Sequence, residues 1–248
     1  MFNFSSIKES VRKLSNLVKV NPDITDEDYI VKEINKFKNS IRRKQMVDGE
    51  NYYNGKHDIL KAKRMGIGEN GDLIELENLP NNRIVDNQYK KMVDQKNNYL
   101  LGQPITFQCE NDVYAKLIKK IFNKKFLRLM RNVGEDSLNE GIAWLYVYYD
   151  EKGVFSLKRF KGYEIIPGWK DAEHTILEYV IRIYEVIKVE KNQEKIIEKV
   201  EVYDENGVYY FTLEGNRLIP DNPKFKTHFS VIDHDGNIDG YNWTKIPI

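Results

Sequence analysis

The chain has 248 residues, of which 41% are hydrophobic and 12% aromatic, and this composition excludes a wholly disordered or collagen-like protein. Lys and Arg total 39 against 38 Asp and Glu, so the net charge of +1 gives no overall attraction to nucleic acid or to an anionic membrane. The single cysteine, Cys109, excludes a disulfide-stapled scaffold, and no apolar run is long enough to span a membrane, so we expect an intracellular, soluble chain.

A long helix is the first element that the sequence predicts. Thr25 and Asp28 form a capping signal at its start, and Asn54-Gly55 gives a stop signal just after Tyr53, because glycine accepts the left-handed conformation found past helix ends. Four apolar residues at helical spacing form its predicted buried stripe: Ile30, Ile34, Phe37 and Ile41.

Three further helices are predicted before Gly141, after a loop or hairpin at residues 61–82 that contains three glycines and Pro80. The second helix covers residues 83–101 and is expected to bury four residues: Val85, Tyr89, Val93 and Leu100. A short extended piece at 106–110 then leads to a third helix over 113–122 and a fourth over 126–138.

Beyond Gly141 the residues become β-branched and aromatic, and turn signals arrive at the spacing of strands. A hairpin is predicted from strands 142–149 and 154–160, and three more strands are predicted at 175–188, 196–203 and 208–213. The stretch from Asn216 is rich in Pro, Asp, Asn and Gly, and we assign no strand to it.

The fold class is therefore α+β, with N-terminal helices followed by an antiparallel β-meander. We expect one continuous unit with three parts. These are an N-terminal arm at 1–24, a helical part at 25–141 and a β-rich part at 142–248.

Two glycine-rich segments resemble the sequence motifs of nucleotide-binding loops but do not match them fully. Residues 66–71 read Gly-Ile-Gly-Glu-Asn-Gly, but no buried strand precedes them and no helix pattern follows, so a glycine turn is predicted. Gly49 and Gly55 lie one residue too far apart for a phosphate-binding loop, and His57 stands where that loop needs Ser or Thr.

The sequence patterns that could indicate a metal site or a catalytic site match poorly. We therefore predict no catalytic residue, no metal and no cofactor. Asp233, Asp235, Asn237 and Asp239 have calcium-ligand character at the wrong spacing for an EF-hand, and the alternative is a solvated turn. The four histidines are scattered, and Cys109 is expected to be an inert, packed thiol. A third group, Glu198, Lys199 and Glu201, is a poor version of a nuclease cluster.

One charge feature stands out between Val113 and Gly134, where seven basic residues occur with no acidic residue. They are Lys116, Lys119, Lys120, Lys124, Lys125, Arg128 and Arg131. On two helices they would form a basic stripe that contacts either phosphates or an acidic neighbouring subunit, and the alternative is an ordinary solvated face.

Several segments resemble a known family. Residues 52–57, Tyr-Tyr-Asn-Gly-Lys-His, are similar to a Tyr-Tyr-x-Gly-x-His segment near the start of tailed-bacteriophage portal proteins, or head-to-tail connectors. Further segments resemble that family in the same order: Asn81–Lys90 with Tyr99–Ile105, Gly141–Asp150, Glu164–Pro167 with Arg182–Tyr184, and Trp243–Ile248.

This resemblance implies the outer wing part of a structural, non-enzymatic subunit that forms a dodecamer-type homo-oligomeric ring at one vertex of the phage capsid. It implies a place in the virion, and in the host cytoplasm during assembly. Double-stranded DNA would pass through the ring without sequence specificity during packaging and ejection. The implied protein partners are the terminase large subunit, the head-completion or adaptor protein, and the major capsid and scaffolding proteins. Family members are far longer, so we expect the stem, clip and crown to be absent here.

Two other classes of function stay open. One is a DNA-processing, nuclease-like enzyme of a mobile element, which metal-dependent cleavage would identify. The other is a monomeric basic adaptor module, which salt-dependent DNA binding would identify.

Overall fold

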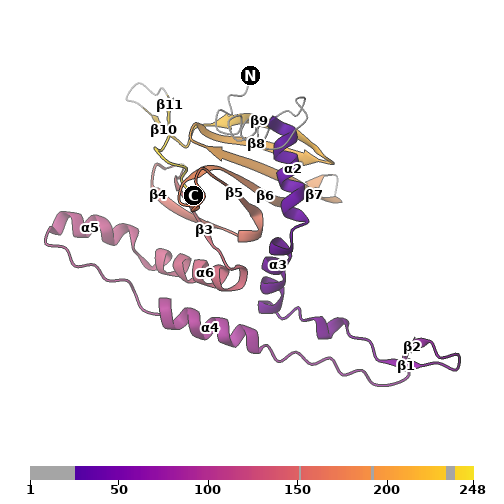
Figure 1. Ribbon diagram of the computed structural model, residues 1–248. Helices are drawn as coiled ribbons and strands as arrows, with labels where there is room; N and C mark the ends of the chain where they lie inside the picture. Colours follow the sequence, from indigo (N-terminus) through magenta and orange to yellow (C-terminus); the bar gives the residue numbers. More distant parts are fainter. Residues whose placement is uncertain (1–25, 151, 191–192, 233–237) are drawn as a thin grey trace.

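Figure 1 shows a computed structural model of the chain, which describes residues 26–150, 152–190, 193–232 and 238–248. The predicted N-terminal arm and Thr25 lie outside the described residues, as do Asp233, Asp235 and Asn237 of the calcium-like segment. One helix lies against a twisted sheet, three helices lie below it, and a short helix and a small hairpin project at opposite ends (Figure 1).

The described helices precede most of the sheet, as predicted. They are α2 (Asp26–Lys38), α3 (Ile41–Tyr53), α4 (Gln88–Leu101), α5 (Asp112–Ile121) and α6 (Lys124–Glu140), with short 3-10 turns η1 (Asp58–Lys61) and η2 (Gly162–Glu164). Together with the strands they confirm the α+β class.

The main sheet is an antiparallel meander whose five strands are hydrogen-bonded in their order along the chain. These strands are β5 (Ile165–Trp169), β6 (Leu177–Glu190), β7 (Gln193–Asp204), β8 (Gly207–Glu214) and β9 (Arg217–Lys226). Three separate two-stranded hairpins accompany it: β1 (Met65–Ile67) with β2 (Leu73–Glu75), β3 (Trp144–Tyr149) with β4 (Phe155–Phe160), and β10 (Phe229–Ile232) with β11 (Ile238–Tyr241).

Alternate residues of the main sheet pack on opposite faces, because side chains alternate along a strand. One face carries Ile181, Val202 and Phe211 and packs against Ile30 and Ile34 of α2, both of which are fully buried. The other face packs against the β3–β4 hairpin and the C-terminal residues, and its cluster contains Trp144, Phe160, Ile165, Val180, Tyr203, Val208 and Ile246. The sheet therefore has a core on each side.

The prediction of one long first helix was wrong, because the chain breaks between α2 and α3. Ser40 has an extended backbone, and its Oγ accepts a hydrogen bond from the Arg43 N–H at 3.1 Å. The same hydroxyl donates to the carbonyl of Phe37 at 2.7 Å. A serine that caps a new helix competes with continuation of the old one. Beyond the break the stripe rotates away from the core, and Ile41 is 75% exposed.

The second predicted helix begins later than expected, at Gln88. The Asn87 side-chain oxygen caps α4 by accepting from the Lys90 N–H at 2.9 Å, and its amide donates to the carbonyls of Tyr52 and Tyr53 at the end of α3. Helix α4 packs against α3 and α6.

Several other local predictions were also wrong. Val85 lies in the loop before α4, and Leu100 is exposed. The piece at 106–110 forms no strand. The Pro-rich stretch after Asn216 forms β9, which contains Pro220 and Pro223; β9 is an edge strand, where missing backbone N–H groups are tolerated.

Candidate interaction surface

The basic stripe lies on α5 and α6, and six of its seven side chains are exposed: Lys116, Lys119, Lys120, Lys124, Lys125 and Arg128. Within the described ranges, none of these six basic side chains makes an ion pair or a hydrogen bond. Lys116, Lys119 and Lys120 occupy the side of α5 opposite its apolar residues, as their spacing in a 3.6-residue turn requires. The prediction that these six residues contact a partner or phosphate remains a prediction.

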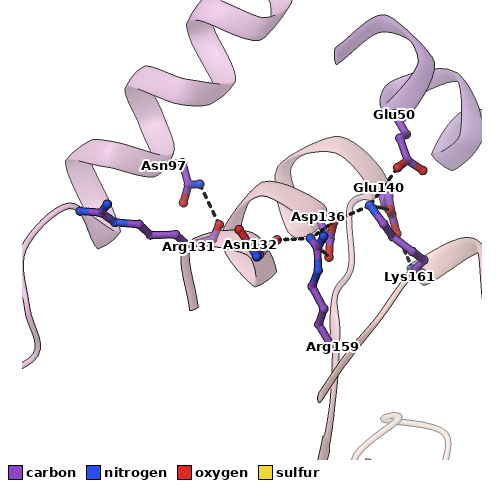
Figure 2. A network of polar contacts seen from close by, with 9 residues as sticks. Glu50, Asn97, Arg131, Asn132, Asp136, Glu140, Arg159 and Lys161 are labelled. Carbon is purple, nitrogen blue, oxygen red and sulfur yellow. Dashed lines mark hydrogen bonds and ion pairs between the residues drawn. The ribbon is translucent and has the colours of Figure 1, made fainter. Parts of the chain in front are cut away.

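Arg131, the seventh residue of the stripe, is turned inward. Its guanidinium donates to the carbonyls of Leu101 at 3.1 Å and Gly102 at 2.7 Å, which are unsatisfied acceptors at the end of α4. The Arg131 carbonyl in turn accepts from the Asn97 side-chain amide at 2.8 Å (Figure 2). Arg131 therefore joins α6 to α4, and its charge already serves a contact within the chain.

The other end of α6 is fixed by a buried carboxylate that the sequence did not indicate. The Asp136 side chain is 1% exposed and accepts from Arg159 Nη1 at 3.0 and 2.9 Å and from Lys161 Nζ at 2.8 Å (Figure 2). Lys161 also contacts Glu50 of α3 at 2.9 Å. This network holds α3, α6 and the end of β4 together.

Glu140 completes this junction at the last residue of α6. One carboxylate oxygen accepts a hydrogen bond from the Gly162 N–H, and the other lies 3.7 Å from Lys161 Nζ. The pKa of Glu140 is raised to about 7, mainly by burial and also by the negative charge of Asp136, and the hydrogen bond from the Gly162 N–H opposes this rise.

The apolar side of α5 is uncovered for much of its length. Val113 is 70% exposed and Leu117 is 52% exposed, although both lie on one stripe of a strongly amphipathic helix. The C-terminal end of α5 is held by Phe122, which packs against Phe107 and Phe126 with ring centroids 4.4 Å apart in both pairs. An apolar face exposed in this way is typical of a surface that contacts another molecule.

The glycine-rich segments have structural roles. Residues 66–71 lie in the β1–β2 hairpin, whose turn is closed by the Gly68 N–H donating to the Asp72 carbonyl at 2.7 Å, so the predicted glycine turn is confirmed. Gly49 lies within α3 against α6, and the His57 ring stacks on Tyr52 with centroids 4.8 Å apart. Neither segment has the strand–loop–helix context of a nucleotide site.

The three residues of the nuclease-like group have separate partners. Glu198 pairs with Lys38 of α2, whereas Lys199 donates to Asp221 at 2.7 Å. Glu201 accepts a hydrogen bond from the Arg182 guanidinium. In the described part of the chain no three His, Cys, Asp or Glu side chains are placed to hold one metal ion.

Arg182 forms a second buried charge cluster that the sequence did not reveal. Its guanidinium lies 4.1 Å from the ring centre of Phe160 and 4.0 Å from that of Tyr184. It donates to Glu164 and Glu201, in each case at 3.1 Å. A guanidinium held between two rings and paired with two carboxylates is a structural anchor of the sheet face.

Cys109 lies in the loop before α5 and is partly exposed, so the expectation of a packed thiol was wrong. Its thiol lies 3.6 Å from the Asn111 carbonyl. Among the described helices, none combines the length and the apolar character needed to cross a bilayer.

Comparison with known proteins agrees with the resemblance seen in the sequence. A family model described as phage portal protein, SPP1 Gp6-like, matches residues 17–237. The portal protein of Bacillus phage SPP1 is 28% identical over 168 residues, which cover 67% of this chain and 32% of that protein. The portal protein of Clostridium phage phiCD119 is 29% identical over 163 residues, which cover 62% of this chain and 36% of that protein. The match spans about a third of each relative. Because the family model covers most of the sequence, the chain belongs to the SPP1 Gp6-like family of phage portal proteins.

Proposed function

We propose that this chain is a structural, non-enzymatic subunit of the portal ring at the unique vertex of a phage capsid. The observation that carries the proposal is the family match over residues 17–237, which includes both the helical and the β-rich parts. The assembled ring is the channel through which double-stranded DNA enters and leaves the head. It is also the platform on which the terminase large subunit and the head-completion protein dock in turn.

The charge distribution supports a role in assembly. A ring is built from head-to-tail contacts, in which one surface of a subunit meets a different surface of the next. The chain has almost equal numbers of acidic and basic residues, and some basic side chains lack partners in the described chain. This distribution suits contacts between subunits better than it suits tight binding to DNA. The six exposed residues of the basic stripe therefore meet an acidic face of the neighbouring subunit or of the capsid shell.

Assembly of the purified chain tests this function. We expect oligomers of uniform mass in analytical ultracentrifugation and closed rings in electron micrographs. A chain that stays monomeric at every concentration would overturn the proposal. The triple variant Lys119→Glu/Lys120→Glu/Lys124→Glu should reduce assembly. The control is a triple reversal at three other exposed lysines, Lys152, Lys170 and Lys195, which makes the same change in net charge.

A monomeric adaptor that binds DNA is the second candidate, and the same unpaired basic side chains favour it. This adaptor would bind DNA as a monomer, with an affinity that falls steeply as salt rises, because bound phosphates release counterions. The portal function instead predicts ring formation with weak or no DNA binding by the monomer. A metal-dependent DNA cleavage assay on the same sample tests the nuclease class.

A further inference from the structure

We propose that the β1–β2 hairpin of one subunit docks on the apolar and basic surface of α5 in the next copy of the chain. This inference rests on the proposed ring and assigns one of its contacts. The observation behind it is that the β1–β2 hairpin and α5 both expose apolar side chains, carry opposite charge and lie at opposite ends of the molecule (Figure 1).

The hairpin is an arm that extends away from the other described elements (Figure 1). Its bridging contacts are local, such as Lys63 with Glu75 at 2.5 Å and the Arg64 guanidinium with the Pro80 carbonyl at 3.1 Å. A lone two-stranded hairpin is marginally stable in water. Ile67 and Leu73 are a cross-strand pair on one face and are 79% and 72% exposed, so the described residues leave this face largely uncovered.

Helix α5 is likewise short and exposes an apolar surface. It is 10 residues long, which is shorter than the roughly 12–15 residues that an isolated helix needs for stability. The exposed stripe of Val113, Tyr114 and Leu117 is an apolar surface that the paired side chains of Ile67 and Leu73 can cover.

The charges of the two elements favour the hairpin as the partner that binds the α5 surface. Residues 65–79 contain four acidic residues and no basic one, and Glu69, Asp72 and Glu77 make no ion pair within the described chain. Residues 113–134 contain seven basic residues and no acidic one. Two copies of α5 facing each other would bring like charges together, which disfavours a symmetric contact. A hairpin-to-helix contact is instead head-to-tail, and head-to-tail contacts build rings.

The test uses two charge-reversed variants of the full chain and their mixture. The helix variant is Lys116→Glu/Lys119→Glu/Lys120→Glu, and the hairpin variant is Glu69→Lys/Asp72→Lys/Glu77→Lys. Each alone places like charges across the contact, so self-association should weaken about 100-fold or more. In an equimolar mixture, each hairpin again faces an oppositely charged helix, so alternating oligomers should form.

Sedimentation velocity measures mass for each variant, for the mixture and for the control reversal at Lys152, Lys170 and Lys195. Monomeric single variants, an assembled mixture and an assembled control support the contact. If the wild type assembles and the two variants assemble equally well, the contact is wrong and the ring proposal stands. Assembly loss that mixing does not restore also overturns the contact. A wild type that never assembles overturns both proposals.

Discussion

Arg159 of β4 holds both carboxylate oxygens of Asp136, a residue of α6, through a single nitrogen atom at 3.0 and 2.9 Å. The two residues come from opposite sides of Gly141, where the helical part gives way to the β-rich part. Because the Asp136 side chain is almost completely buried, its charge depends on Arg159 and on Lys161 for compensation.

Replacement of Asp136 by Asn should therefore cost about 3–5 kcal/mol of unfolding free energy, the range found when one partner of a buried pair is removed. The loss leaves the Arg159 guanidinium and the Lys161 ammonium close together without a shared carboxylate. Urea denaturation measures the change. The control is Asp86→Asn, which removes an exposed partner of Lys91 and should cost no more than about 1 kcal/mol. Equal effects at the two sites would contradict the assigned role of Asp136.

Gly49 should resist substitution by Ala although it lies inside a helix. A Cβ at this position would lie 2.0 Å from the backbone oxygen of Asn139, so α3 and α6 would have to separate. Alanine normally stabilises a helix interior by about 1 kcal/mol over glycine. We expect the clash to reverse that gain and leave a net loss of about 1–3 kcal/mol.

The matched control is Asp48→Ala, on the exposed side of the same helix, where better helix propensity should leave stability unchanged or slightly higher. Thermal unfolding followed by circular dichroism compares the two variants. A Gly49→Ala protein as stable as the wild type would show that α3 and α6 do not touch at this point.

Local patterns predicted most of the β-rich half. Short-range signals predict its hairpins: the turn sequences at Asp150–Gly153 and Asp204–Gly207, and the alternation of residues such as Val200 and Val202. The structure forms hairpins at both turn sequences. The α2–α3 break was missed because four correctly spaced apolar residues outweighed one capping serine, Ser40. Strand β9 was missed because prolines count against a central strand but not against an edge strand.

The sequence predicted which basic residues belong to the candidate surface but not how each side chain is oriented in the fold. Six basic residues remain exposed because helical spacing keeps them on outward faces. The inward turn of Arg131 depends on where α4 ends, some thirty residues earlier in the chain. The same holds for Asp136, since its partner Arg159 belongs to a strand, and no local spacing signals that contact.

Glu140 should make stability fall as pH rises. Its pKa of about 7 in the folded protein lies above the ordinary value of 4.5, so the folded state binds more protons between these values. The stabilising contribution is therefore complete below about pH 4.5 and is lost as pH rises through 7. Glu140→Gln keeps an oxygen for the Gly162 N–H without the charge.

Urea denaturation of wild type and Glu140→Gln from pH 5 to pH 8 isolates this effect, because all other titrating groups are common to both proteins. We expect the variant to gain stability relative to the wild type as pH rises. Parallel pH profiles would show that the Glu140 carboxyl titrates alike in the folded and unfolded chain.

Ser40→Ala should destabilise the protein by about 1 kcal/mol, the usual cost of losing a helix N-cap side chain. The Arg43 N–H loses its acceptor at the start of α3, and the Phe37 carbonyl loses one of its two donors but keeps the Ser40 backbone N–H. In a chain of this size the melting temperature should fall by roughly 2–4 °C. Ser40→Asp keeps an acceptor for the Arg43 N–H and should recover most of the loss, whereas Ser230→Ala on exposed β10 should change nothing. A Ser40→Ala protein at least as stable as the wild type would mean that packing of α2 and α3, and not the serine cap, imposes the break between them.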